Sequence, residues 1–362
     1  MPVEETFNKA KEFFKATAGK VKKTAEQAAQ TVKESLAMEP PMLSICMMGP
    51  RAVGKTTVIT SIFAKSQETV GDSKIYMRTG NANANELPNY KANLMSAIES
   101  GDAAQLPATE VESDFLFELG VLGNPATVKL SIQDYPGEYL TSEDAQKKKK
   151  VSDFVQQSHI IFVAIDTPYL MEEGGRFNAE KNMPDIVKGF LENHSNECAN
   201  KLVMFVPLKC ERYYYDGRMN EVDQRVMETY GDMVEFFKKH NMASVIAPIL
   251  TLGGIEFDKM VDNDKGMGTV SKLATYRMYA KNPKYMPLYC SQPFYYLLTY
   301  VSKYYEWQKN QTSGVLNRLR DTLNSYLTSD SVFLSEIKKM HTRLITDKFG
   351  YKVITNNSII HI

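Results

Sequence analysis

The chain has 362 residues, and its 43 Lys and Arg residues balance 43 Asp and Glu residues. This length suggests two domains or one large domain with extensions, and the balanced charge gives no overall field that would favour nucleic acid as a partner. The four cysteines form no C-x-x-C pair, and no apolar stretch approaches the roughly 20 residues that cross a bilayer, so we expect a cytoplasmic protein.

The first 38 residues are rich in Ala, Lys, Glu and Thr, and their weak apolar stripe predicts one long helix. Such a helix must pack on the globular body, on another chain or on a membrane surface. The membrane is the least favoured of the three because the stripe is narrow. We therefore predict an amphipathic helix and linker over residues 1–41, a main domain over 42–310 and a helical tail over 311–362.

A phosphate-binding motif follows the first apolar run, which spans residues 42–48 and has the length of a buried parallel strand. Residues 49–56 read G-x-x-x-x-G-K-T, and residues 56–65 have helical spacing. In this strand–loop–helix context, main-chain N–H groups cradle a polyphosphate, Lys55 neutralises its outer phosphates and the Thr56 hydroxyl holds Mg²⁺. The residues expected to bind the nucleotide here are Gly49, Pro50, Arg51, Ala52, Val53, Gly54, Lys55, Thr56 and Thr57.

The polar stretch 78–113 reads as a loop with one helix around residues 90–99. Thr109 lies in this loop just before the next apolar run. Its hydroxyl could reach magnesium and the terminal phosphate, which would order the loop only when a triphosphate is bound. An ordinary loop threonine is the alternative.

The remaining apolar runs predict the sheet. Runs 115–119 and 128–132 look like an antiparallel pair, and runs 159–165, 202–206 and 245–250 are separated by long helical segments. This alternation predicts an α/β fold with a mostly parallel sheet and helices on both faces. Ligands of such sheets bind at the carboxyl ends of the strands, where the motifs described next also lie. Residues 291–345 are predicted to be helical.

A D-x-x-G motif follows the run 128–132 directly. Asp134 could hold the hydration shell of Mg²⁺, and the Gly137 N–H could bond the terminal phosphate; a helix cap or turn is the alternative. Glu138 comes next, and a carboxylate beside a phosphate is repelled unless its pKa rises or a cation intervenes. Arg51 is one candidate for that cation, although a solvated loop arginine is an interpretation at least as good.

Residues after the later runs suggest how the base is recognised. The stem of Lys209 could lie along a purine ring, and Glu211 could accept the two N–H groups on the edge of guanine. At Gly253 the backbone could approach the base oxygen. A charged loop after a strand is the alternative. The run 147–150 consists of four lysines, which form either a solvated helix face or a docking site for an acidic partner.

In this order, the segments resemble a translation-factor-class GTPase of the Ras-like branch. In more detail, segments 48–57, 106–110, 133–138 and 206–213 resemble the bacterial double-GTPase family. The resemblance implies a GTP-dependent switch that works with partner proteins in a bacterial conflict or signalling system. The chain departs from the usual pattern at Leu208 (usually Asn), at Glu211 (usually Asp) and at Glu138 (usually Gln).

The leading hypothesis is an Mg²⁺-dependent GTP hydrolase whose product is a conformational state, with segments 78–113 and 138–158 as switches. We expect slow intrinsic turnover, which an arginine from a protein partner would accelerate. The residues expected to act in catalysis are Lys55, Thr109, Gly137, Glu138 and Arg51, and those expected to hold metal are Thr56, Thr109 and Asp134. Alternatives are a non-hydrolysing nucleotide-bound scaffold, or an ATPase or kinase on the same loop.

Overall fold

The computed structural model describes most of the main domain. The described residues are 40, 42–66, 70, 72–80, 86–100, 112–198, 201–264, 270–280, 284–309, 331–346 and 352–356. The predicted N-terminal helix and Thr109 lie outside them.

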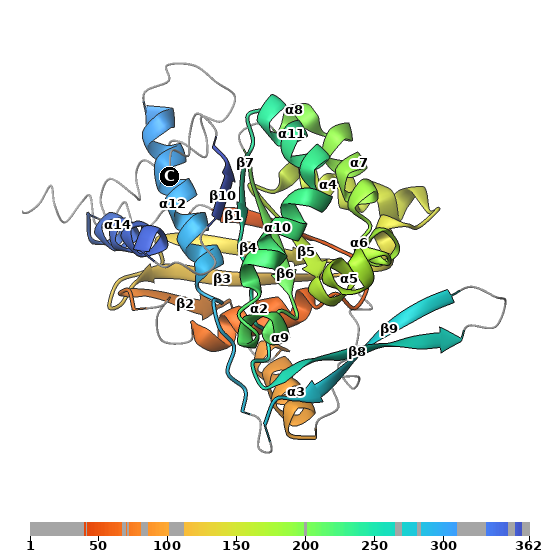
Figure 1. The fold of residues 1–362 in the computed structure, drawn as a ribbon. Helices are drawn as coiled ribbons and strands as arrows, with labels where there is room; N and C mark the ends of the chain where they lie inside the picture. The colour runs from red at the N-terminus through yellow and green to blue at the C-terminus, as the bar shows by residue number, and fades with distance from the viewer. Residues whose placement is uncertain are drawn as a thin grey trace, which may run out of the picture.

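Eight strands form one sheet in the order β10-β7-β6-β5-β1-β4-β3-β2 (Figure 1). Its five central strands, from β7 to β4, are parallel, while β3 and β10 pair in the antiparallel sense with their neighbours. The strands are β1 Met42–Met48, β2 Ile75–Thr79, β3 Ser113–Val121, β4 Val128–Asp134, β5 Ile160–Asp166, β6 Leu202–Leu208, β7 Ala243–Ile246 and β10 Lys352–Thr355. The predicted fold class, α/β with a mostly parallel sheet, is confirmed.

Helices cover both faces of the sheet, and two hydrophobic cores separate it from them (Figure 1). One core includes residues of α2 (Lys55–Lys65), α3 (Glu86–Ser100), α12 (Gln292–Lys309) and α14 (Ser331–Thr346). The other includes residues of α4 (Ala145–Gln157), α7 (Pro184–Asn193), α8 (Ser195–Cys198), α10 (Met219–Thr229) and α11 (Gly231–Lys239). Short helical turns complete the described chain: η3 Gly137–Leu140, α5 Thr167–Met171, η4 Glu172–Gly175, α6 Asn178–Asn182 and α9 Glu211–Tyr215.

Strand β1 illustrates why the central strands read as continuous apolar runs. Ile45 and Met47 point into the first core, whereas Cys46 and Met48 point into the second. A strand buried on both faces needs apolar side chains at every position, so the alternation typical of a half-exposed strand is lost.

Two described elements within residues 311–362 belong to the same sheet and core. Phe333 and Ile337 of α14 are buried in the first core. Strand β10 pairs with β7, and the hydroxyls of Ser244 and Thr355 lie 2.7 Å apart. The packing of these elements continues that of residues 42–310.

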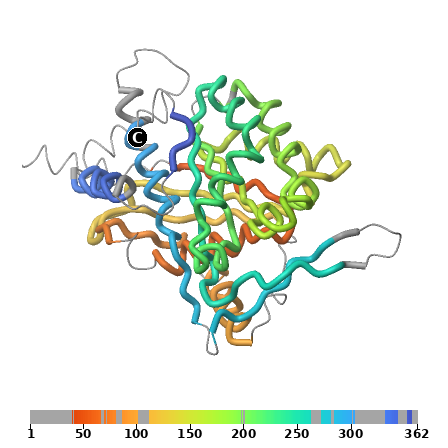
Figure 2. Tube along the Cα trace, viewed as in Figure 1, coloured from red at the N-terminus to blue at the C-terminus, as the bar shows by residue number. Residues whose placement is uncertain are grey.

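A second, two-stranded sheet consists of β8 (Ile255–Asp264) and β9 (Val270–Met278). This antiparallel hairpin extends away from the body of the molecule (Figures 1 and 2). Sequence analysis did not predict it, because β8 mixes apolar with acidic residues and shows no apolar run. Among the hairpin residues whose burial the structure describes, those at its beginning are buried, at Ile255, Glu256 and Phe257.

Candidate functional site

The motif segments meet at the end of the sheet where the parallel strands have their carboxyl ends. Strands β1, β4, β5 and β6 are neighbours and parallel, so the loops that follow Met48, Asp134, Asp166 and Leu208 all leave from their carboxyl ends. This is the end at which open α/β sheets bind their ligands.

The loop between β1 and α2 is closed and tightly packed. A Cβ at Gly49 would lie 3.0 Å from the Cβ of Ala164, and Ala52 and Gly54 have φ angles of 61° and 111°. The side chain of Val53 is buried in the first core, so this residue offers only its main chain to a ligand. Because α2 begins directly after the loop, the free N–H groups of its first turn lie beside it.

Lys55 turns into the loop and away from bulk water. Its side chain is buried, and Nζ donates to the carbonyls of Gly49 at 3.1 Å and Pro50 at 3.3 Å. Burial lowers the pKa of Lys55, and the nearby carboxylates of Asp134 and Glu138 oppose that shift. The loop therefore carries a buried ammonium group whose present acceptors are main-chain carbonyls that an anion could replace.

Thr56 and Asp134, separated by 78 residues in the chain, meet beside the loop. The Thr56 hydroxyl donates to Asp134 Oδ2 at 2.5 Å. Within the described part of the chain, no three His, Cys, Asp or Glu residues gather as a metal site. Magnesium, however, usually takes only one or two protein oxygens and completes its shell with phosphates and waters. A hydroxyl and a carboxylate oxygen at this distance fit such an ion.

The D-x-x-G segment lies directly on the phosphate loop. A Cβ at Gly137 would lie 2.0 Å from the main-chain N of Arg51 and 2.2 Å from the carbonyl C of Pro50. Glu138 follows, and its Oε2 is buried with no hydrogen-bond partner among the described residues. The side chain of Arg51 is exposed, so its role as a counter-charge stays a prediction. Thr57 is half-buried in the first turn of α2.

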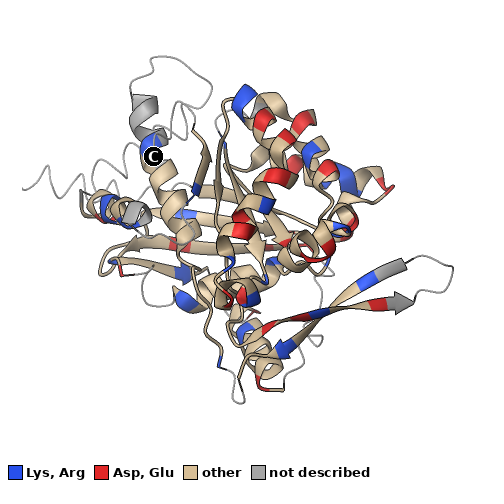
Figure 3. Ribbon diagram, viewed as in Figure 1, with Lys and Arg blue, Asp and Glu red and all other residues tan. Residues whose placement is uncertain are grey.

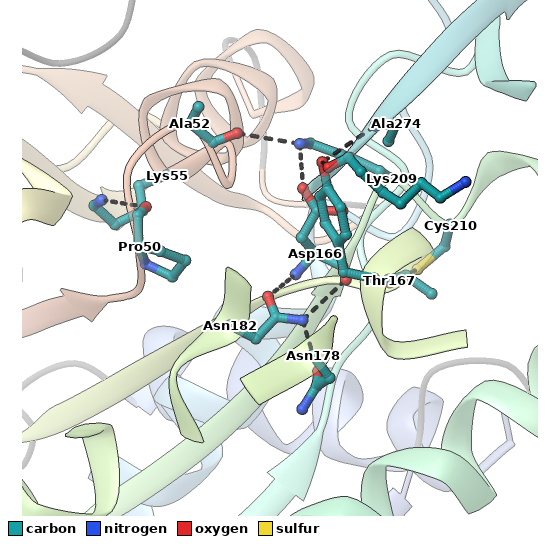
Figure 4. A network of polar contacts seen from close by, with 12 residues as sticks. Pro50, Ala52, Lys55, Asp166, Thr167, Asn178, Asn182, Lys209, Cys210 and Ala274 are labelled. Carbon is teal, nitrogen blue, oxygen red and sulfur yellow. Dashed lines mark hydrogen bonds and ion pairs between the residues drawn. The ribbon is translucent and has the colours of Figure 1, made fainter. Parts of the chain in front are cut away.

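Lys209 connects the segment after β6 to the phosphate loop (Figure 4). Its Nζ donates to the carbonyl of Ala52 at 3.1 Å and forms an ion pair with Asp166. Burial alone would lower the pKa of Lys209, but the adjacent Asp166 carboxylate raises it above its ordinary value. Asn182 holds Asp166 in place, because its Oδ1 accepts from the main-chain N of Asp166 at 2.7 Å.

Asp166 was not among the site residues expected from the sequence, although its position at the end of an apolar run could have identified it. Asp166 ends the apolar strand β5, just as Asp134 ends β4. The residue also lies next to Leu208 across the β5–β6 pair, which places it beside Lys209.

Two of the three residues expected to recognise the base, Glu211 and Gly253, contact each other. Glu211 is buried, and its Oε1 accepts from the main-chain N of Leu252 at 3.0 Å and of Gly253 at 3.3 Å. Burial raises the pKa of Glu211, and these two amides oppose the shift. Gly253 has a φ of 71°, and a Cβ there would lie 2.1 Å from the carbonyl O of Met286. The close approach at this glycine is thus made to the protein, and guanine recognition stays a prediction.

The four lysines of the run 147–150 lie on α4. Lys149 pairs with Asp153 at 2.8 Å, Lys150 pairs with Glu112 at 2.5 Å, and Lys147 Nζ lies 5.4 Å from the ring centroid of Tyr139. Basic and acidic residues are interspersed over the helices (Figure 3). These internal contacts favour a solvated helix face over a docking site.

No family model matches this chain, and no curated protein matches it. Among solved structures, the GTP-bound GTPase-like domain of S. cerevisiae Ski7 has a TM-score of 0.40 at 13% identity and covers 79% of this chain and 54% of its own. Sup35 in complex with GDP has a TM-score of 0.28 at 10% sequence identity, and the match covers 58% of this chain and 38% of the Sup35 chain. The bacterial dynamin GTPase LeoA from ETEC has a TM-score of 0.30 at 14% sequence identity, and the match covers 88% of this chain and 42% of the LeoA chain.

This chain therefore spans about half, or less, of the length of those three structures. At these TM-scores the likenesses bear on neither fold nor function. Separately, none of the helices in the described ranges combines the length and the apolar composition needed to cross a membrane.

Proposed function

We propose that this protein is an Mg²⁺-dependent nucleoside triphosphate hydrolase that works as a molecular switch, with GTP as its nucleotide. The observation that carries the proposal is the 2.5 Å contact between Thr56 and Asp134 beside the phosphate loop. The two oxygens come from separate motifs and converge next to a buried lysine. An accidental G-x-x-x-x-G-K-T sequence would have no reason to produce this arrangement.

The residues of the site would have the following roles in binding and hydrolysis. Main-chain N–H groups of residues 49–56 would bind the phosphates, and Lys55 would exchange its carbonyl acceptors for the outer phosphate oxygens. Thr56 and Asp134 would hold Mg²⁺, which neutralises the charge that develops during phosphoryl transfer. The main-chain N–H of Gly137 would bond the terminal phosphate.

Glu138 would accept a hydrogen bond from the attacking water, since its buried Oε2 makes no other hydrogen bond to the described residues. A carboxylate at this place also repels the terminal phosphate, which explains why we expect slow turnover. An arginine supplied by a partner would offset that repulsion and accelerate hydrolysis by several orders of magnitude.

The wider biological assignment rests on the sequence resemblance. We propose membership of the bacterial double-GTPase family, a cytoplasmic location and a role with partner proteins in a conflict or signalling system. Thr109 would add a second hydroxyl to the magnesium site. Membrane contact through residues 1–38 is the less favoured arrangement.

Glu138 also supports a second candidate function, a nucleotide-bound scaffold that does not hydrolyse. Where a glutamine would orient water without charge, a fixed negative charge opposes attack on an anion. On this alternative, bound nucleotide would only order the surrounding loops for a partner.

One experiment tests the proposal. The purified protein is denatured and any released nucleotide identified by chromatography, and hydrolysis of GTP and ATP is then measured with and without Mg²⁺. We expect guanine nucleotide, and phosphate release that requires Mg²⁺ and exceeds that of Lys55→Ala. Binding without hydrolysis above that variant would select the scaffold. Failure to bind any nucleotide would refute both.

A further inference from the structure

The β8–β9 hairpin contacts the two short helices that follow β5 and β6, α5 and α9. From α5, the Tyr169 hydroxyl accepts from the main-chain N of Ala274 at 3.1 Å. From α9, Arg212 Nη1 donates to the carbonyl of Asp258 at 2.5 Å, and the guanidinium carbon Cζ lies 5.6 Å from the ring centroid of Phe257. The near half of the hairpin is thus held against the candidate site, while its far half extends from the body (Figure 1).

Tyr276, on β9, is the hairpin residue that reaches Lys209. The centroid of its ring lies 5.6 Å from Lys209 Nζ. Its buried hydroxyl faces this ammonium group. On the other side of the lysine, Oδ1 of Asp166 is buried without a hydrogen-bond partner in the described ranges. Buried polar atoms in native proteins nearly always have a partner, so an unpaired carboxylate oxygen next to this ammonium group indicates a polar ligand.

The position of this cluster relative to the phosphate loop identifies that ligand. Lys209 Nζ donates to the carbonyl of Ala52, so the cluster adjoins the outer side of the loop. A nucleotide with its phosphates in the loop must carry its nucleoside away from it, past the neighbouring segments. The side chain of Lys209 lies along one path that the nucleoside could take, and Tyr276 lies beside this side chain.

We propose that Tyr276 is a nucleoside-binding residue, whose ring packs on the sugar and base of the nucleotide and whose hydroxyl bonds to a polar group of the nucleoside. This inference rests on the proposed function, because it requires that residues 49–56 bind the phosphates. It assigns the hairpin, which no motif identifies, to one wall of the binding site. Stacking on an aromatic ring tolerates every base, so this contact favours nucleosides without selecting guanine.

The test compares a nucleotide with its phosphate part alone. Dissociation constants for GTP and for inorganic tripolyphosphate are measured with Mg²⁺ for the wild-type protein, Tyr276→Ala and Tyr276→Phe. The matched control is Tyr279→Ala, which removes an exposed ring that stacks on Tyr215 just beyond the same strand. Thermal unfolding of each variant checks that it is folded.

We expect Tyr276→Ala to weaken GTP binding about tenfold and to leave tripolyphosphate binding unchanged. Tyr276→Phe keeps the ring and should bind GTP more tightly than Tyr276→Ala, and Tyr279→Ala should match the wild type. Unchanged GTP binding by Tyr276→Ala, or equal losses for both ligands, would overturn the inference alone. A wild-type protein that binds neither ligand would overturn the proposed function and this inference with it.

Discussion

Replacing Gly137 by alanine should force the D-x-x-G segment away from the phosphate loop. The new Cβ would lie 2.0 Å from the N of Arg51 and 2.2 Å from the C of Pro50, whereas ordinary contacts begin at 3.4 Å. Both obstacles are main chain, so no rotamer change relieves the clash and the two backbones must part by more than about 1 Å. Overpacking of this kind costs about 1–3 kcal/mol of folding free energy.

The same displacement should reduce catalysis more than stability. A misplacement of about 1 Å in a catalytic group can lower the rate about 100-fold. The assay measures Mg²⁺-dependent phosphate release at saturating GTP, together with the midpoint of thermal unfolding. We expect hydrolysis to fall about 100-fold and the midpoint to drop by several degrees.

Gly189→Ala is the matched control, because the substitution is chemically identical and a Cβ there meets nothing within 4 Å. Gly189 lies inside α7, where alanine is favoured over glycine by about 0.5–1 kcal/mol, so the control should be slightly more stable and fully active. If Gly137→Ala hydrolyses GTP as fast as the wild type and melts at the same temperature, the close packing of the two motifs has no functional role.

Asp134→Asn should lower phosphate release at least tenfold and shift its Mg²⁺ dependence to higher concentrations; an unchanged Mg²⁺ titration would contradict the metal assignment. Burial lowers the pKa of His159 from 6.5 to about 4, and its Nδ1 accepts from the main-chain N of Ser44. The neutral ring therefore stabilises the folded state fully above pH 6.5, and this contribution is lost as the pH falls to 4. Urea titrations should show the free energy of unfolding decreasing by up to about 3 kcal/mol over that range, and by less in His159→Gln. Lys201 Nζ donates to three carbonyls within residues 155–158 at the end of α4, so Lys201→Met should cost about 2 kcal/mol, and an unchanged urea midpoint would refute this.

The elements that could be predicted from the sequence share one property, burial on both sides. Strands β1, β5 and β6 are apolar at nearly every position because helices cover both faces, and that pattern is visible in the chain. The elements that were missed are small or exposed. β10 has four residues and is a strand only because it pairs with β7, more than 100 residues away in the chain. The hairpin β8–β9 extends from the body, so its sequence lacks the continuous apolar runs from which the buried strands were predicted.

The phosphate loop is predictable from local sequence, because its conformation depends on consecutive residues: glycines at both ends, and a helix that begins at Lys55. Which other groups lie beside the loop depends instead on how distant segments pack. Thr56 meets Asp134 because β4 lies next to β1, and Lys209 meets Asp166 because β6 lies next to β5. Strand order is a global result of packing and is not written in any one segment. For the same reason, the sequence could name Glu211 as a base reader but could not show that its carboxylate is engaged by the amides of Leu252 and Gly253.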